Sequence, residues 1–141
     1  MNINLTLMKG IWTILLILVL AGCNKNQTTS HITYDKNIKI VALGDSLTYG
    51  YGSKKSYPEY LSEISGYTVI NAGVNGDKSS DVLLRLHKVV DLKPRLVLLS
   101  IGGNDMLRSV NHNDIQRNIE DIIKTLKSNN IDVVLIAQPQ P

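Results

Sequence analysis

Short apolar runs alternate with amphipathic segments along residues 38–137. Continuous apolar runs predict buried strands at 38–43, 96–101 and 131–137, and a shorter strand at 68–71. Between these runs the apolar residues recur every three or four positions, which predicts helices at 56–64, 82–90 and 114–126. Ser79 or Ser80 is expected to cap the second helix.

Strands and helices in strict alternation predict an α/β domain. The strands are apolar throughout, as is typical of a parallel sheet whose two faces are both covered by helices. Right-handed crossovers between such strands give a doubly wound, flavodoxin-like sheet. We expect the strand order 2-1-3-4, which places the reversal of order between the first and third strands.

The N-terminal segment has the pattern of a secretory signal. Lys9 precedes the apolar run 11–20, and the sequence Leu20-Ala21-Gly22-Cys23 follows. The run is shorter than the ~20 apolar residues of a membrane-spanning helix. The Leu-Ala-Gly-Cys run resembles a bacterial lipobox. This implies a signal peptide at 1–22, lipidation of Cys23 by acyl chains such as palmitate, and a polar tether at 23–37.

A lipidated protein of this kind is expected to cross the inner membrane. It would then be anchored by its lipid in the bacterial periplasm, at the outer membrane or on the cell surface. The alternative is an uncleaved membrane anchor that Cys23 happens to follow.

Composition limits the number of domains and the kinds of ligand that this chain is expected to bind. The chain has 141 residues, which suits one domain, and a net charge of +3 scattered along the sequence. No basic stripe is interleaved with aromatic residues, so nucleic-acid binding is not expected. A single cysteine excludes an intramolecular disulfide and a cysteine-based metal site, and no metal or other cofactor is expected.

Three glycine-containing polar runs each follow a predicted strand directly. They are residues 44–47 (GDSL), 71–77 (NAGVNGD) and 102–105 (GGND). Since the carboxyl ends of parallel strands share one edge of a sheet, these loops are expected to converge there. Ser46 would lie at a strand-to-helix turn. Its N–H, the Gly76 N–H and the Asn104 amide are candidate donors to an oxyanion.

Each run taken alone is also a plausible turn, and a nucleotide-binding loop is a further possibility in principle. However, the sequence contains neither Gly-x-Gly-x-x-Gly nor Gly-x4-Gly-Lys-Ser/Thr. It is the occurrence of all three runs, each behind its own strand, that favours an acyl-transfer site.

The three runs resemble the first three conserved blocks of the SGNH, or GDSL, hydrolases. The similarity is greatest to the bacterial arylesterase, lysophospholipase and acyl-CoA thioesterase I subgroup. It covers residues 38–141 and includes the stretches 40–52 and 93–105. The resemblance implies an ester or thioester substrate, Ser46 as nucleophile, and Gly76 and Asn104 as oxyanion donors. It also implies supporting roles for Asp45, Gly103 and Asp105, and a place for Arg108 near the substrate groove.

The sequence departs from this family at its C-terminal side. The family takes its general base from a late Asp-x-x-His, and no such run follows Asn104. Residues 38–141 are therefore expected to be a partial, truncated domain that lacks a final strand and helix and has little activity alone. Of the three histidines, His31 lies in the tether, His87 lies in a helix and is expected to be solvated, and His112 follows the third loop without a matching motif.

Two other functions stay open. One is a non-catalytic lipoprotein that binds acyl or glycan ligands, and the other is a carbohydrate deacetylase, an activity found in the same family. The strand at 131–137 would form an open sheet edge in a truncated domain, and such an edge favours aggregation.

Overall fold

A computed structural model describes residue 35 and residues 37–137. The predicted signal peptide, Cys23, His31 and almost all of the predicted tether lie outside these residues. Among residues 37–137, no helix has the length and apolar character needed to cross a bilayer.

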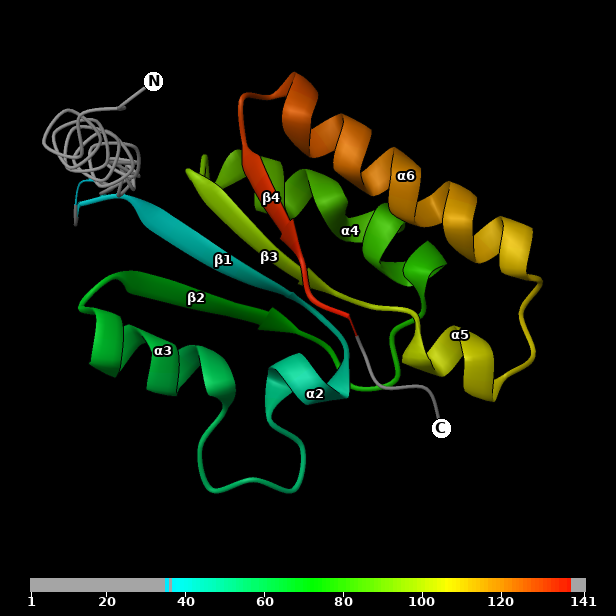
Figure 1. The fold of residues 1–141 in the computed structure, drawn as a ribbon, viewed down its shortest axis with the longest axis horizontal. Helices are drawn as coiled ribbons and strands as arrows, with labels where there is room; N and C mark the ends of the chain where they lie inside the picture. The colour runs from blue at the N-terminus through cyan, green and yellow to red at the C-terminus, as the bar shows by residue number, and fades with distance from the viewer. Residues whose placement is uncertain (1–34, 36, 138–141) are drawn as a thin grey trace, which may run out of the picture. The chain divides into compact units, whose positions relative to one another are not determined.

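The described part is a four-stranded parallel sheet with helices between the strands (Figure 1). The strands are β1 (Lys39–Gly44), β2 (Thr68–Gly73), β3 (Leu96–Ser100) and β4 (Asp132–Leu135). The longer helices are α3 (Tyr57–Ser65), α4 (Ser79–Asp91) and α6 (His112–Ser128). Two short helices, α2 (Ser46–Tyr49) and α5 (Gly103–Leu107), follow β1 and β3 directly.

The strand order is β2-β1-β3-β4, which confirms the predicted doubly wound sheet. Gly44 pairs with Gly73 on one side and with Ser100 on the other. The three strands that carry the glycine-containing runs therefore end level with one another. β2 and β4 are the edge strands of this sheet, and Val134 and Leu135 of β4 are exposed.

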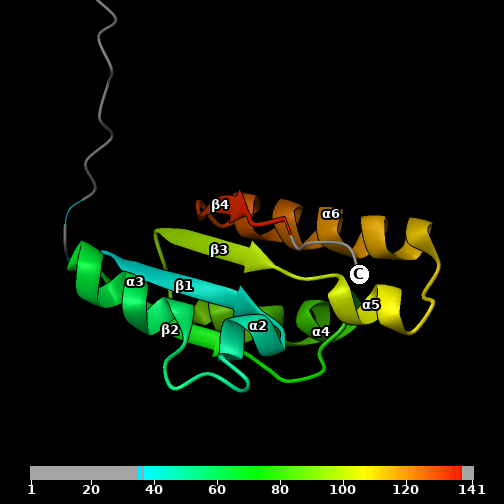
Figure 2. The same ribbon diagram turned by 60° about the horizontal axis from the view of Figure 1, so that its bottom comes forward.

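The main core lies between the sheet and the helices α4 and α6. It is formed by apolar side chains of β1, β3, α4 and α6, namely Val41, Leu43, Val97, Leu99, Val82, Leu86, Val89, Ile122 and Leu126. Helix α3 packs against β2 from the other side, as right-handed crossovers require (Figure 2). Each buried aliphatic side chain contributes about 1.5–3 kcal/mol to folding.

Local sequence explains where the helices begin. Glu59 Oε2 accepts hydrogen bonds from the Ser56 N–H (2.7 Å) and hydroxyl (2.9 Å), which forms a capping box at the start of α3. Asn111 caps α6 by accepting from the Asn113 N–H at 2.9 Å. Gly66 ends α3 in the left-handed conformation.

The predicted cap of α4 was wrong. The cap position is Lys78, whose N–H donates to the Asp81 carboxylate at 2.9 Å, and Ser79 is already inside the helix. The physical reason is competition, because the Ser79 hydroxyl donates to a tertiary partner, Asp105, instead. Helix α6 also begins two residues earlier and ends two residues later than the predicted range 114–126.

Candidate functional site

Ser46 lies at the turn where β1 becomes α2. Asp45 is buried and caps α2, with its Oδ1 accepting from the Leu47 N–H at 3.0 Å. Ser46 is the first residue of the helix and remains partly exposed. The Asp45 carboxylate therefore fixes the turn, while Ser46 itself is partly exposed to solvent.

The turn depends on the absence of a side chain at Gly44. A Cβ atom at that position would lie 2.2 Å from the Ser100 carbonyl oxygen and 2.3 Å from Thr48 Oγ1. Backbone and helix thus approach each other more closely than any other residue would permit. Gly44 sets the distance between the end of β1 and the end of β3.

A second turn follows β2 and carries Gly76. The Val74 N–H donates to the Gly44 carbonyl at 3.0 Å, and the Asp77 N–H donates to the Val74 carbonyl at 3.2 Å. Gly76 has φ +81°, in the left-handed region that favours glycine. The loop that presents the Gly76 N–H is therefore attached to the end of the strand that carries Ser46.

Asn104 reaches this loop from the other side of β1. It lies in α5, and its Nδ2 donates to the Asp77 carbonyl oxygen at 3.0 Å. This hydrogen bond joins the loop after β3 to the loop after β2. Arg108, at the end of α5, also lies here, because its Nη2 is 3.4 Å from the point that a Cβ on Gly76 would occupy.

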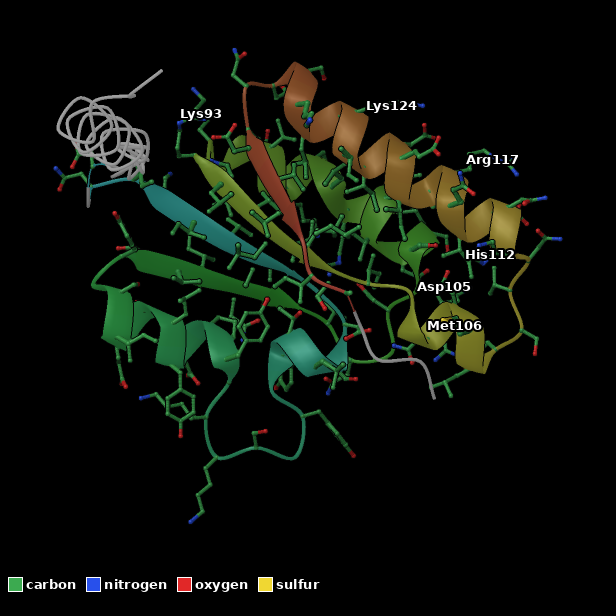
Figure 3. All side chains as sticks on the ribbon, viewed as in Figure 1. Lys93, Asp105, Met106, His112, Arg117 and Lys124 are labelled. Atoms are coloured by element: carbon green, nitrogen blue, oxygen red, sulfur yellow. The ribbon has the colours of Figure 1, made fainter. Side chains whose placement is uncertain are left out.

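Asp105, next to Asn104, is fully buried and faces the start of α4 (Figure 3). Its Oδ2 accepts from the Ser79 N–H at 2.8 Å and its Oδ1 accepts from the Ser79 hydroxyl at 2.6 Å. Asn118 of α6 donates to the same hydroxyl at 3.0 Å. Gly103, the first residue of α5, continues the chain directly from the left-handed Gly102.

Two residues of this arrangement, Arg85 and Asn118, were missed from the sequence, and Ser79 was expected only as a helix cap. Arg85 donates from Nε to the Asp77 carboxylate at 2.7 Å, and from Nη2 to the carbonyls of Gly44 and Ala72 at 3.1 and 3.0 Å. A signal was available, because Arg85 lies three residues after Val82 and next to Leu86 on the inner side of α4. A charged residue on that side needs a buried partner.

The described residues include two histidines, His87 and His112. Neither is hydrogen-bonded to Ser46 within residues 37–137. His87 is exposed on α4, as predicted. His112 is exposed as the first residue of α6 (Figure 3). Within residues 37–137, no three side chains of His, Cys, Asp or Glu gather closely enough to hold a metal ion.

The hydroxyl groups of Thr48, in α2, and of Tyr57, at the start of α3, are both buried. Burial raises the pKa of the Tyr57 phenol, the Thr48 hydroxyl opposes this, and the charge of the Asp45 carboxylate adds to it. Neither Thr48 Oγ1 nor the Tyr57 oxygen has a well-formed hydrogen bond within the described part of the chain.

Comparison with known proteins shows the family of this chain. Residues 42–141 match the model of the GDSL-like lipase/acylhydrolase family. The chain belongs to that family. An arylesterase of Vibrio mimicus is 35% identical over 106 residues, which make up 70% of this chain and 53% of the arylesterase. The thioesterase 1/protease 1/lysophospholipase L1 of Escherichia coli K12 is 32% identical over 102 residues, covering 69% of this chain and 49% of that enzyme.

The fold of this GDSL-family chain also matches solved structures. AlinE4, an SGNH-hydrolase family esterase, superposes with a TM-score of 0.70 at 34% identity, covering 77% of this chain and 63% of AlinE4. The chain spans about half the length of the curated relatives described above. Esterase and thioesterase relatives support a hydrolase, and the polar runs of this chain lie at the edge of the sheet where ligands bind in doubly wound folds.

Proposed function

We propose that this chain carries the nucleophile and the oxyanion-binding part of an ester or thioester hydrolase. Ser46 Oγ would attack the acyl carbonyl, form the acyl-serine bond, and release the alcohol or thiol, which takes up the serine proton through a base. Water would then cleave the acyl-serine bond and restore the hydroxyl. The observation that supports this most is the hydrogen bond that holds the Asn104 amide against the loop of Gly76.

The Asn104 amide has two N–H groups, and only one is needed for Asp77. The second is left to donate to a negatively charged oxygen. The Gly76 N–H and the Ser46 N–H, at the start of α2, are two further candidate donors. Three donors fixed before the substrate arrives are the arrangement that stabilises a tetrahedral intermediate.

The surroundings of Ser46 favour an acyl group as the substrate part bound here. Four apolar side chains in α2, in α5 and in the loop after β2 are exposed to solvent: Leu47, Val74, Met106 and Leu107. We infer that these side chains, which follow the same strand ends as the site, would contact an acyl chain, and that Arg108 would contact a polar or anionic part of the substrate.

Within the described residues, no hydrogen bond brings a histidine to Ser46 as a general base. No Asp-x-x-His follows Asn104, and the two described histidines are exposed on α4 and α6. Removing the histidine of a protease triad lowers turnover by on the order of 10⁶. We therefore propose that these 141 residues alone turn over esters very slowly. The exposed positions of both described histidines leave a second candidate, a lipoprotein that binds acyl ligands without catalysis.

Hydrolysis of p-nitrophenyl acetate by the purified chain and by Ser46→Ala separates the two candidates. We expect slow turnover at most, together with stoichiometric labelling of Ser46 by a fluorophosphonate. If Ser46→Ala and the unchanged chain behave identically in both measurements, the proposed nucleophile is wrong. Fast turnover that Ser46→Ala abolishes would disprove the proposed impairment.

The place of the protein in the cell is a separate proposal. We propose export followed by lipid anchoring at Cys23, on the basis of the Leu20-Ala21-Gly22-Cys23 run. Cells grown with radioactive palmitate should label the chain but not Cys23→Ala, and equal labelling of the two would contradict the proposal.

A further inference from the structure

Arg85 contacts the ends of the two strands that precede the Ser46 turn and the Gly76 loop. Its side chain extends from α4 and is only 20% exposed. Nε donates to the Asp77 carboxylate, and Nη2 donates to the carbonyls of Gly44 and Ala72. One guanidinium therefore contacts the ends of both β1 and β2 and the loop that follows β2.

The acceptors of Arg85 are the points from which the loops of the site begin. Gly44 precedes the Asp45-Ser46 turn, Ala72 precedes the Gly76 loop, and Asp77 directly follows Gly76. The Asp77 carbonyl in turn accepts the hydrogen bond from Asn104. A continuous chain of contacts thus runs from the strand of Ser46, through Arg85 and Asp77, to the Asn104 amide.

We propose that Arg85 is a positioning residue that sets the direction of the Gly76 N–H and of the Asn104 amide relative to Ser46. The inference rests on the proposed function of those groups as oxyanion donors. Arg85 does not touch the substrate and acts through Asp77 and the two strand ends. Substrate binding is consequently expected to depend on it less than the step in which charge develops on the oxygen.

The chemistry requires arginine at this position. The guanidinium is planar and presents several N–H donors in a fixed fork, so it can serve a carboxylate and two carbonyls at once. A lysine would keep the charge but offers a single ammonium on a flexible stem. Arg85→Lys therefore separates the positioning role from the simple neutralisation of Asp77.

The first test measures the rate at which a fluorophosphonate labels Ser46 in the full chain, at several probe concentrations. In this reaction the serine oxygen bonds to phosphorus, fluoride leaves, the serine proton passes to solvent, and the P=O oxygen occupies the oxyanion position. We expect Arg85→Lys to lower the maximal rate about tenfold while the half-saturating concentration stays within about twofold. Arg117→Lys is the matched control, because Arg117 is exposed on α6 and pairs only with its own helix neighbour Asp114.

A double-mutant cycle with Asn104→Ala distinguishes positioning from general stabilisation. If Arg85 acts through Asn104, Arg85→Lys should slow labelling much less in the Asn104→Ala background than in the unchanged chain. Fully additive effects would overturn the proposal.

A second readout does not need a reactive Ser46. In ¹⁵N-labelled protein, Arg85→Lys and Arg85→Gln should shift the Gly76 amide and Asn104 side-chain signals and leave the amides of Leu99 and Ile122 in place. If the unchanged chain is not labelled at Ser46, the proposed function fails and these spectra alone decide the role of Arg85. Unmoved Gly76 and Asn104 signals, or unfolding of both variants, would overturn the inference.

Discussion

Asp105 and Ser79 are joined by two hydrogen bonds, of 2.8 and 2.6 Å, in a region that solvent does not reach. The pair connects α5, which carries Asn104, to the start of α4, which carries Arg85. A carboxylate that is buried in this way must keep its donors, because leaving it without them costs more than the hydrogen bonds contribute.

Asp105→Ala is expected to lower the free energy of unfolding by about 2–3 kcal/mol, since it leaves the Ser79 donors without their acceptor. Urea unfolding followed by circular dichroism measures this. Asp114→Ala is the control, because Asp114 forms an exposed pair with Arg117 and should cost about 0.5 kcal/mol. Equal losses in the two variants would contradict the role given to Asp105.

Gly44→Ala should destabilise the chain more than Gly52→Ala. The added methyl at Gly44 meets the Ser100 carbonyl and Thr48, whereas nothing lies within 4 Å at Gly52. Gly52→Ala costs only its left-handed backbone, about 1 kcal/mol. Gly44→Ala has no such backbone cost, but its steric overlap should lower the free energy of unfolding by about 1–3 kcal/mol. Similar unfolding midpoints for the two variants would show that β1 and β3 can separate at no cost.

The capping box at Glu59 predicts a pH dependence. The Ser56 backbone N–H, followed by the Ser56 hydroxyl, lowers the pKa of Glu59 below its usual value near 4.5. Its stabilising contribution is therefore present above pH 4.5 and lost as the pH falls through the lower pKa of the folded state. Glu59→Gln should reduce the stability difference between pH 7 and pH 3. A control, Glu120→Gln, changes an exposed pair on α6, and an unchanged pH profile in Glu59→Gln would refute the prediction.

Tyr57 should make the chain sensitive to alkali. Burial raises the pKa of its phenol, so the folded state holds the proton more tightly than the unfolded state. Stability is then lost as the pH rises from about 10 through the raised pKa. Tyr57→Phe should therefore unfold at a higher pH than the unchanged chain. At pH 7 its free energy of unfolding should stay within about 0.5 kcal/mol of the unchanged chain, because the hydroxyl has no well-formed hydrogen bond. A lower alkaline midpoint would contradict this account.

The open edge of the sheet predicts self-association. Val134 is 48% exposed on β4, which is an edge strand of the sheet within residues 37–137. Val134→Lys should therefore reduce the concentration-dependent light scattering of the purified chain. Leu84→Lys is the control, because Leu84 is 78% exposed but lies on α4. An equal reduction in both variants would show that any exposed apolar residue contributes alike.

Much of this arrangement could be predicted from the sequence. Apolar runs located the four strands, and their continuity indicated a parallel sheet. Because parallel strands end at one edge, runs as far apart as those of Ser46 and Asn104 were expected to converge. These predictions succeeded because they depend on local patterns and on the general rules of strand connection.

Side-chain partners between helices and loops could not be predicted in the same way. Arg85 finds Gly44 across 41 positions of sequence, and only the rotation of α4 against the sheet determines that contact. Ser79 or Ser80 was expected to cap a helix because local sequence favours it, but a buried carboxylate from α5 competed for the Ser79 hydroxyl. The preference of serine for a helix cap is overridden where a distant residue offers its hydroxyl a stronger hydrogen bond.

The strand order also governs when the site can exist during folding. β1 must pair with β3, which joins residues as distant in sequence as Ile40 and Leu96, before Ser46 and Asn104 can come together. Contacts of this range close late, since the chain must first lose the entropy of the long loop between them. The site should therefore report global folding. Any fluctuation that opens the β1–β3 ladder would separate the proposed oxyanion donors.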